Sequence, residues 1–499
     1  MSTRDIVLGP PGTGKTTRLL TMVEEELASG THPERIGYFS FTKRAANEAV
    51  SRACERFSLQ RRDLPYFRTL HSLCFRATGM TNSDVFDGQN VLEFGDWIGL
   101  KLSSTQRVED TTKFGFTDGD RAMFMENLSR VMNIPLRELY ERNNDGLPWT
   151  LVERVSEGLR QYKKARNLHD YTDMLDQFVR ASWAPQLEVV FVDEAQDLST
   201  LQWRVVDELS RGARRVVIAG DDDQAIYRWA GAAVEHFVGL DGTVTVLGQS
   251  WRVPPQVQTV AHEVIGRVAH RRPKEWAAAA HEGAVIRSPS VLDSDLSGSD
   301  ILILSRNAFS LRAAASDLRR EGLLYEFRDN SSVPRAVLSA VRMWEGLRHG
   351  KSMSVDDVRT VYNYMTSGRG IRRGYKALQG VPSDQIVDLS WLQASGGLET
   401  TAEWYTALDR IPRDDMNYLR AALQNGEKPD TPRIRLATIH GSKGGEADHV
   451  VLLPDMAHRT YDEMRVEPED EARVWYVAVT RARRNLTLVR PKDRKHYVL

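Results

Sequence analysis

The chain has 499 residues, 41% of them hydrophobic, and a formal net charge of −1 at pH 7. This length predicts about two to four domains, and the near-neutral charge excludes a protein that coats nucleic acid with a uniformly basic surface, so any nucleic-acid site must be a local groove. Because only two cysteines occur, Cys54 and Cys74, a disulfide scaffold and a cysteine-rich zinc site are both excluded.

The sequence also bears on location. It shows neither a secretory leader nor a run of the roughly 18 apolar residues that span a bilayer. It contains no short-period repeat and no low-complexity tract. We therefore expect a cytoplasmic protein that has no membrane partner.

A phosphate-binding pattern lies near the start of the chain. Residues 9–16 read Gly-Pro-Pro-Gly-Thr-Gly-Lys-Thr, which matches G-x-x-x-x-G-K-[ST] in full. An apolar run at 6–8 precedes it and a helical pattern follows, as the motif requires, and this context disfavours a plain Gly/Pro turn. In such a loop backbone N–H groups and a helix N-terminus surround phosphate oxygens. Lys15 would reach the β- and γ-phosphates of a nucleotide, and the Thr16 hydroxyl would bind Mg²⁺.

Alternating strand and helix signals follow. A strand is expected at 36–41 and a helix at 43–57, whereas residues 76–185 are rich in helix formers and charge. Strand signals return at 187–192 and 215–219, and alternation of this kind is typical of a parallel α/β sheet. Such sheets bind ligands at the carboxyl ends of their strands.

The strand at 187–192 ends in two acids. Asp193 would coordinate the metal ion, and Glu194 would act as the general base. A solvated strand end is the usual interpretation of such a pair taken alone. Together with the loop at 9–16, however, the pair completes one nucleotide site.

A second strand end leads into an acidic loop and an aromatic pair. Gln224 can donate and accept hydrogen bonds, which suits contact with a γ-phosphate. Tyr227 and Trp229 offer ring faces for stacking nucleic-acid bases. From composition alone, an aromatic pair in an ordinary core is an equally good interpretation.

Further strands are expected at 244–247, 301–304, 434–438 and 450–453, and residues 341–430 look helical and irregular. The fold class is therefore α/β, with two parallel-sheet domains that each carry a mainly helical insertion. The expected domains are residues 1–75 with 186–243, an inserted helical domain at 76–185, residues 244–340 with 431–499, and a small inserted domain at 341–430.

The chain resembles superfamily 1 DNA helicases of the UvrD/Rep/PcrA type. The resemblance extends across nearly the whole chain, in the family's order, through Gly9–Thr17, Tyr38–Ala49, Thr69–Leu73, Asn167–Leu175, Val192–Asp197, Gly220–Ala232, Leu247–Pro254, Ile434–Val451 and Glu471–Leu486. It implies two RecA-like motor domains, and ATP and Mg²⁺ as cofactors. It also implies single-stranded and forked duplex DNA as partners of a monomeric motor that moves 3′→5′.

The resemblance also implies roles for individual residues. Lys15, Asp193, Glu194, Gln224, Arg252 and Arg481 would be catalytic, with the two arginines acting as arginine fingers from the second motor domain. Trp251 would stack on adenine and Glu446 would contact the ribose. The remaining nucleotide contacts would be Gly9, Pro10, Pro11, Gly12, Thr13, Gly14, Thr16, Thr17 and Gly444. Single-stranded DNA would contact Phe41, Thr42, Arg44, His71, Tyr227, Trp229 and His440.

These patterns bear on four candidate activities. A helicase and a single-strand translocase that barely unwinds share every motor residue. A regulatory ATPase of a repair or defence complex would hydrolyse ATP rapidly without DNA. A small-molecule kinase is disfavoured, because it needs neither an aromatic ladder nor arginines from a second α/β domain.

Overall fold

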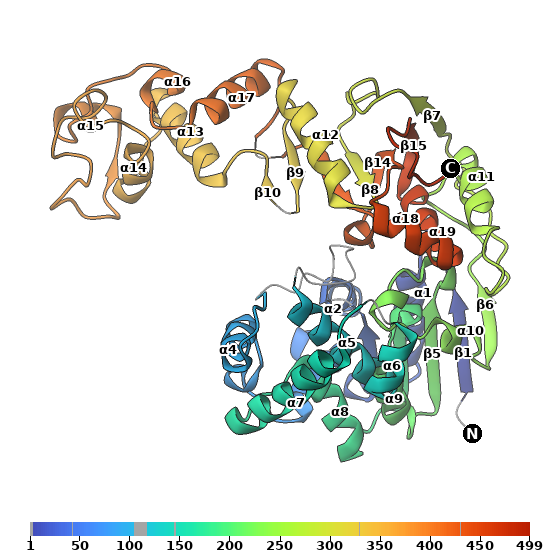
Figure 1. The fold of residues 1–499 in the computed structure, drawn as a ribbon. Helices are drawn as coiled ribbons and strands as arrows, with labels where there is room; N and C mark the ends of the chain where they lie inside the picture. Colours follow the sequence, from blue (N-terminus) through green and yellow to red (C-terminus); the bar gives the residue numbers. More distant parts are fainter. Residues whose placement is uncertain (1–2, 42, 104–116, 144–145, 329, 430) are drawn as a thin grey trace.

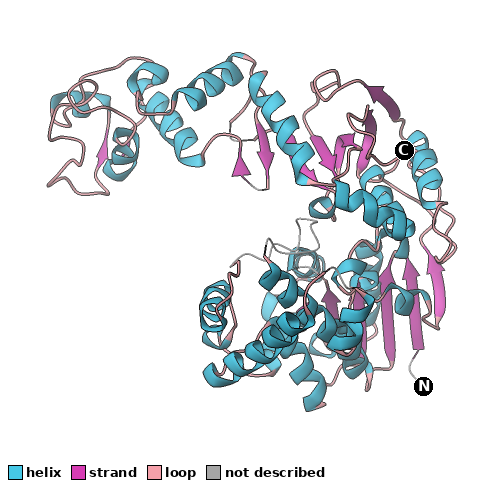
Figure 2. Cartoon of the chain, in the orientation of Figure 1, coloured by secondary structure: helices cyan, strands magenta, loops and turns pink. Residues whose placement is uncertain are grey.

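The computed structural model describes residues 3–41, 43–103, 117–143, 146–328, 330–429 and 431–499. Within these ranges the chain forms two domains built around largely parallel sheets, each interrupted by an insertion (Figures 1 and 2). We refer to them as the first and second domains and the first and second insertions. None of the described helices combines the length and the apolar character that crossing a bilayer requires.

The first domain contains a six-stranded parallel sheet in the order β3-β2-β4-β5-β1-β6. Its strands are β1 (Thr3–Leu8), β2 (Ile36–Ser40), β3 (Phe67–Thr69), β4 (Val189–Asp193), β5 (Arg215–Gly220) and β6 (Thr243–Val246). The apolar runs that form β2 and β4 are buried along their whole length. Strands of this kind belong at the centre of a sheet that is covered on both faces.

Helices cover both faces of this sheet. One face packs against α1 (Lys15–Ala28) and α2 (Lys43–Phe57). The other packs against α3 (Leu70–Ala77), α8 (Tyr171–Ala181), α9 (Thr200–Ser210) and α10 (Val234–Val238). Because Met174, Leu175 and Phe178 of α8 belong to this core, the first insertion ends before α8, and the predicted boundary at 185/186 is wrong.

The predicted boundary at 243/244 is also wrong. The strand expected at 244–247 is β6, and residues 243–246 pair in parallel with residues 5–8 of β1. It therefore forms an edge of the first sheet, and the chain enters the second domain only after it. A strand pattern alone does not reveal which of two sheets provides the pairing partner.

The first insertion is a helical unit with its own core. It comprises α4 (Gly88–Ile98), α5 (Asp118–Met132), α6 (Leu136–Arg142) and α7 (Trp149–Arg166). Phe94, Val155 and Tyr162 lie at the centre of its apolar cluster. This confirms the helical character expected for this part of the chain.

The second domain contains a seven-stranded sheet in the order β10-β9-β13-β8-β14-β15-β7. Its strands are β7 (Ala284–Ser288), β8 (Ile301–Ser305), β9 (Tyr325–Phe327), β10 (Asn330–Ser331), β13 (Ile434–Thr438), β14 (Ala447–Leu453) and β15 (Ala482–Val489). All neighbouring pairs are parallel except β9 with β10. The helices of this domain are α11 (Pro255–Ile265), α12 (Ala308–Arg320), α18 (His458–Val466) and α19 (Pro468–Val479).

The second insertion extends away from the second sheet as an arm, at the upper left of Figure 1. It comprises α13 (Arg335–Arg348), β11 (Met353–Ser354), α14 (Val355–Tyr362), β12 (Ile386–Val387), α15 (Leu389–Ala394), α16 (Trp404–Ala407) and α17 (Arg413–Gln424). Trp344 lies fully buried in its separate core. The predicted boundary at 340/341 is wrong because it cuts α13, which begins directly after Pro334.

Candidate nucleotide site and aromatic cluster

The loop between β1 and α1 takes a conformation that depends on glycine. Gly12 and Gly14 have φ values of +71° and +82°, in the left-handed region that side chains disfavour. A Cβ atom on Gly12 would also lie 2.3 Å from the Cβ atom of Arg252. The pattern at 9–16 therefore allows the second domain to approach the loop closely.

A cavity of about 330 Å³ opens against this loop, between the two domains. Its walls include most of the predicted nucleotide contacts. The residues that line the cavity are Pro10, Gly12, Thr13, Gly14, Lys15, Thr16, Thr17, Phe41, Glu48, Arg52, Asp193, Glu194, Asp197, Gln224, Tyr227, Arg252, Lys443, Gly444 and Arg481. Residues from seven separate stretches of sequence thus converge on one space at the carboxyl ends of the first sheet's strands.

Lys15 lies between the loop backbone and the acidic strand end. Its Nζ atom donates a 3.1 Å hydrogen bond to the Gly9 carbonyl oxygen and lies 3.5 Å from Oε1 of Glu194. A Cβ atom on Gly9 would overlap the Lys15 side chain, at 1.9 Å from its Cγ atom. The first glycine of the pattern therefore leaves room for the lysine to fold back over the loop.

Thr16 and Asp193 meet across the site. The Thr16 hydroxyl donates a 3.0 Å hydrogen bond to Oδ2 of Asp193, and the buried Tyr38 hydroxyl donates one of 2.9 Å to the same oxygen. Burial and the adjacent Glu194 charge raise the pKa of Asp193 above its usual value. A hydroxyl and a carboxylate that converge in this way form the hard oxygen donor set that Mg²⁺ prefers.

Glu194 follows β4 in a left-handed conformation, with a φ of 55°. Burial disfavours its ionised form, but the ammonium groups of Lys15 and Lys443 outweigh burial and hold the pKa of Glu194 below its usual value. Gln196 Nε2 donates a 2.6 Å hydrogen bond to its Oε2 atom. The carboxylate is therefore ionised and fixed in orientation, as a proton acceptor must be.

Two arginines from the second domain reach the cavity. Arg481, which is only 2% exposed, donates hydrogen bonds of 2.9 Å to Gln224 Oε1 and 3.1 Å to the Gly445 carbonyl oxygen. Burial and the nearby Arg252 charge lower the pKa of Arg481 to about 9, which leaves it protonated at neutral pH. Arg252 forms a 2.5 Å ion pair with Glu446.

The remaining predicted nucleotide contacts lie at the rim of the cavity. Trp251 is 75% exposed, and its backbone N–H donates a 2.9 Å hydrogen bond to the Gly12 carbonyl oxygen. The Pro11 carbonyl oxygen accepts a 2.7 Å hydrogen bond from the Ser250 hydroxyl. The exposed indole thus stands beside the loop with its ring available to a planar base.

Lys443 is a further functional candidate, which the sequence motifs did not predict. Its Nζ atom donates hydrogen bonds of 2.5 Å to Asp197 Oδ2 and 2.8 Å to the Gln224 carbonyl oxygen. It also lies 5.0 Å from the centroid of the Tyr227 ring. The only sequence signal was its place in the glycine-rich stretch 441–445, close to Glu446.

Aromatic side chains gather beside the cavity, from four segments far apart in the sequence. We define this aromatic cluster as Phe41, Phe124, Tyr227, Trp229 and His440. Phe41 stacks on Tyr227 with ring centroids 5.5 Å apart, and Phe124 stacks on Trp229 at 6.2 Å. His440 meets the edges of Tyr227 and Trp229 at 6.1 and 6.2 Å. Phe124 comes from α5 of the first insertion and was not predicted.

Exposure differs within the aromatic cluster. Phe41, Tyr227 and Trp229 are partly exposed, whereas His440 is 2% exposed. Burial lowers the pKa of His440 well below its usual value, so its ring is neutral. His440 therefore packs against Tyr227 and Trp229 from the buried side of the cluster. Its own ring offers no exposed face for stacking.

His71, another predicted DNA contact, lies apart from this cluster. His71 meets the exposed ring of Tyr171 edge-on at 5.9 Å, and among the described ring contacts none links it to the cluster. Burial lowers the pKa of His71 to about 4. Thr42 and the Arg44 side chain lie outside the described residues.

Two family profiles match the chain in order. The UvrD/REP helicase N-terminal domain matches residues 2–245, and the UvrD-like helicase C-terminal domain matches residues 405–492. The first match ends at residue 245, within β6, and so covers the first domain together with the first insertion.

Individual relatives are distant. A probable DNA helicase II homolog of Mycoplasma genitalium is 24% identical over 50% of this chain and 37% of its own length. The ATP-dependent DNA helicase PcrA of Bacillus subtilis is 24% identical over 54% of this chain and 38% of its own length. The ATP-dependent DNA helicase UvrD2 of Mycobacterium tuberculosis is 25% identical over 97% of this chain and 76% of its own length. The alignments with the first two relatives thus span less than half of those proteins.

The UvrD2 alignment extends over both sheets and both insertions, so the likeness is not confined to the nucleotide loop. The order of the two matched profiles, together with the two parallel-sheet domains, shows that this chain belongs to the UvrD/Rep/PcrA family of superfamily 1 helicases and that its sheet domains are the family's two RecA-like motor domains.

Proposed function

We propose that this chain is an ATP-dependent DNA helicase that moves 3′→5′ along single-stranded DNA and separates the strands of a forked duplex. The direction of movement is proposed from the family likeness. Action as a monomer in the cytoplasm belongs to the same proposal. The observation that carries it is the short segment 224–229, which runs from the nucleotide cavity to the aromatic cluster and is contacted at both ends by the second domain.

In this proposal the nucleotide occupies the cavity between the domains. The loop at 9–16 surrounds the phosphates, Lys15 neutralises charge on the β- and γ-phosphates, and Trp251 stacks on the base, with Glu446 near the ribose. Thr16 and Asp193 would hold Mg²⁺, which supplies further charge neutralisation when it is bound. The convergence of their oxygens on one point supports this assignment.

Hydrolysis then follows from the charges already in place. Glu194 accepts a proton from water as the water oxygen bonds to the γ-phosphorus and the bond to the β–γ bridging oxygen breaks. Arg252 and Arg481 stabilise the charge that develops on the transferred group. Because both arginines come from the second domain, they act only when the two domains are close together.

DNA would bind across the aromatic cluster. The partly exposed rings of Phe41, Tyr227 and Trp229 offer stacking surfaces for successive bases. Closure and reopening of the two domains during hydrolysis would shift these rings along the strand. DNA contacts from Thr42, Arg44 and His71 remain predictions.

The proposal is tested by measuring ATP hydrolysis with and without single-stranded DNA, alongside unwinding of duplexes with 3′ or 5′ tails. We expect stimulation by DNA and unwinding of the 3′-tailed duplex only. Stimulation without unwinding would identify a single-strand translocase. Rapid hydrolysis that DNA does not change would identify a regulatory ATPase, and absence of hydrolysis would overturn the proposal.

A further inference from the structure

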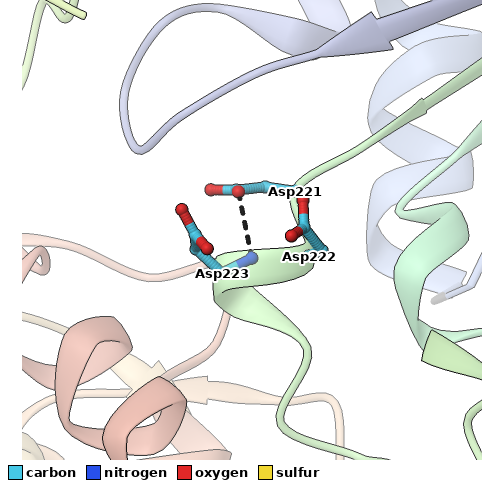
Figure 3. A group of neighbouring side chains, drawn as sticks. All are labelled: Asp221, Asp222 and Asp223. Carbon is cyan, nitrogen blue, oxygen red and sulfur yellow. Dashed lines mark hydrogen bonds between the residues drawn. The ribbon is translucent and has the colours of Figure 1, made fainter. Parts of the chain in front are cut away.

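Three consecutive carboxylates lie at the interface of the motor domains, in the loop that follows β5. Asp221, Asp222 and Asp223 are buried and close enough together to resemble a metal site (Figure 3). However, the Nζ atom of Lys274, whose side chain is 1% exposed, lies 3.2, 2.5 and 3.1 Å from them in turn. The place that a cation would take is therefore occupied by an ammonium group of the protein.

Lys274 comes from the second domain, in the stretch between α11 and β7. Burial disfavours its charge, but the three carboxylates outweigh burial and raise the pKa of Lys274 above its usual value. A charged lysine buried this deeply is stabilised only where carboxylates surround it. The acidic loop of the first domain is thus fixed by a charge that the second domain supplies.

Asp221 transmits this contact to the nucleotide cavity. Its Oδ1 atom faces Lys274 and accepts a hydrogen bond from the Asp223 N–H, drawn as a dashed line in Figure 3. Its Oδ2 atom accepts a 2.6 Å hydrogen bond from the side-chain Nε2 of Gln224. The Gln224 oxygen accepts in turn from Arg481. A chain of contacts therefore runs from Lys274 through Asp221 and Gln224 to Arg481.

The chain of contacts fixes which way the Gln224 amide points. An ionised carboxylate only accepts hydrogen bonds and a guanidinium only donates them. The NH₂ group of Gln224 must therefore face Asp221, and its oxygen must face Arg481. Without Lys274, Asp221 would be one of three like charges at close range, and their repulsion would disturb the position of its carboxylate.

We infer that Lys274 is a positioning residue for ATP hydrolysis: by fixing Asp221, it holds the Gln224 amide in the orientation needed at the γ-phosphate once the domains have closed. This inference rests on the proposed ATPase function. It assigns Lys274 no contact with nucleotide or DNA. It differs from a purely structural role, in which any buried ion pair between the domains would serve equally well.

Arg271 provides a matched control for this distinction. It also comes from the stretch between α11 and β7, and its guanidinium donates hydrogen bonds of 2.7 and 2.5 Å to the two oxygens of Asp223. These hydrogen bonds end on Asp223 and not on Asp221. Arg271→Gln therefore weakens the same domain interface but leaves the contacts from Lys274 to Gln224 in place.

The experiment measures DNA-stimulated ATP hydrolysis in Lys274→Met, Lys274→Arg and Arg271→Gln. We expect Lys274→Met to lower kcat by about 10- to 100-fold, as small misplacements at a reacting centre do, with the KM for ATP changed by less than about threefold. Lys274→Arg should recover part of the loss, and Arg271→Gln should stay within about threefold of the wild type. Equal losses in Lys274→Met and Arg271→Gln would overturn the inference.

A double-mutant comparison gives a second readout. In a Gln224→Ala background, Lys274→Met should cause no further loss of kcat, because the group that it positions is already absent. Independent, multiplying losses would overturn the inference. If Lys274→Met does not fold, Lys274→Met/Asp222→Asn, compared with Asp222→Asn alone, removes one of the excess buried charges and repeats the test. A wild-type protein without ATPase activity would instead refute the proposed function.

Discussion

The Arg481 guanidinium of the second domain donates a 2.9 Å hydrogen bond to the side-chain oxygen of Gln224 in the first. Both groups line the nucleotide cavity, so a bound γ-phosphate would meet an amide and a guanidinium that are already in contact. A catalytic arginine that is positioned before the reaction needs little reorganisation in the transition state. This contact leads to the first prediction.

Arg481→Ala should lower kcat far more than it raises the KM for ATP, because a finger contact strengthens in the transition state. The loss should be on the order of 10³-fold, as for arginine fingers elsewhere. Arg252→Ala should behave in the same way. Steady-state kinetics at saturating DNA measures both constants, with Arg484→Ala, an exposed arginine on β15, as control. A change in KM alone would contradict the finger role.

Lys15→Ala should abolish ATP hydrolysis and unwinding, since this ammonium offsets charge on the β- and γ-phosphates. Binding of single-stranded DNA without nucleotide should persist, because the aromatic cluster does not include Lys15. Phosphate release and DNA fluorescence anisotropy, measured on the same preparation, check the two halves of this prediction. Near-normal hydrolysis would show that Lys15 and the loop at 9–16 do not act in ATP hydrolysis.

Glu194→Gln should retain binding of ATP and Mg²⁺ but lose turnover by roughly 10²–10⁴-fold, the usual effect of losing a general base. The hydrogen bond between Thr16 and Asp193 does not involve Glu194 and should persist in this variant. Equilibrium binding of a fluorescent ATP analogue, with and without Mg²⁺, is compared with single-turnover hydrolysis. If the affinity for the ATP analogue falls together with the rate, Glu194 instead coordinates the metal or stabilises the fold.

Trp229→Ala should weaken binding of single-stranded DNA by roughly 1–3 kcal/mol, the usual contribution of one stacked base. It should also reduce DNA stimulation of hydrolysis while leaving the basal rate nearly intact. A DNA titration at saturating ATP measures both effects, with the exposed Trp183 changed to Ala as control. Unfolding of the Trp229 variant would support a core role for this ring. Unchanged stimulation would show that Trp229 does not couple DNA binding to ATP hydrolysis.

Arg130→Met should destabilise the packing of the first insertion against α8 of the first domain. Arg130 forms ion pairs of 2.8, 2.6 and 3.0 Å with Glu126, Asp170 and Asp173, and its loss leaves partly buried carboxylates without this partner. We expect about 3 kcal/mol, the lower end for a buried pair, because Arg130 is 26% exposed. Chemical denaturation measures this difference, and Arg137→Met, which breaks an exposed pair, should cost less than about 1 kcal/mol.

The sign of the pH dependence adds a check on the Arg130 prediction. Burial disfavours ionised Asp170, but Arg130 and Lys163 outweigh burial and lower the pKa of Asp170 in the folded protein. The stabilisation is therefore complete above the unfolded pKa of about 4 and is lost as the pH falls below it. The gap between wild type and Arg130→Met should accordingly be largest near neutral pH and shrink in acid. A gap that stays constant below pH ~4 would show that lost packing, and not charge, causes the difference.

Local chemistry made much of the nucleotide site predictable. The spacing from Gly9 to Thr16 is set by phosphate geometry, and Asp193 ends a strand whose unbroken apolar run marks a sheet centre. Side-chain contacts that depend on docking of the two domains were not predictable. Lys443 and Lys274 resemble ordinary surface lysines until the second domain places them against Asp197 and Asp221.

Strands and helices were easier to locate than their domains. The residues of β6 were recognised as a strand, but pairing with β1, and not composition, assigns them to the first sheet. Likewise the helical pattern of α8 does not reveal that Phe178 packs beneath the first sheet. His440 illustrates the same limit, since its motif predicted the location but not that neighbouring rings bury it.

The path of the chain out of β6 has a mechanical consequence. Leu247 donates its backbone N–H to Leu8, the Ser250 hydroxyl bonds to Pro11, and Trp251 bonds to Gly12. The crossover between the motor domains is therefore fastened along the edge of the loop proposed to hold the phosphates. A hinge between the two domains would therefore lie beside this loop, and a small rotation there would move the far end of the second insertion by a much larger distance.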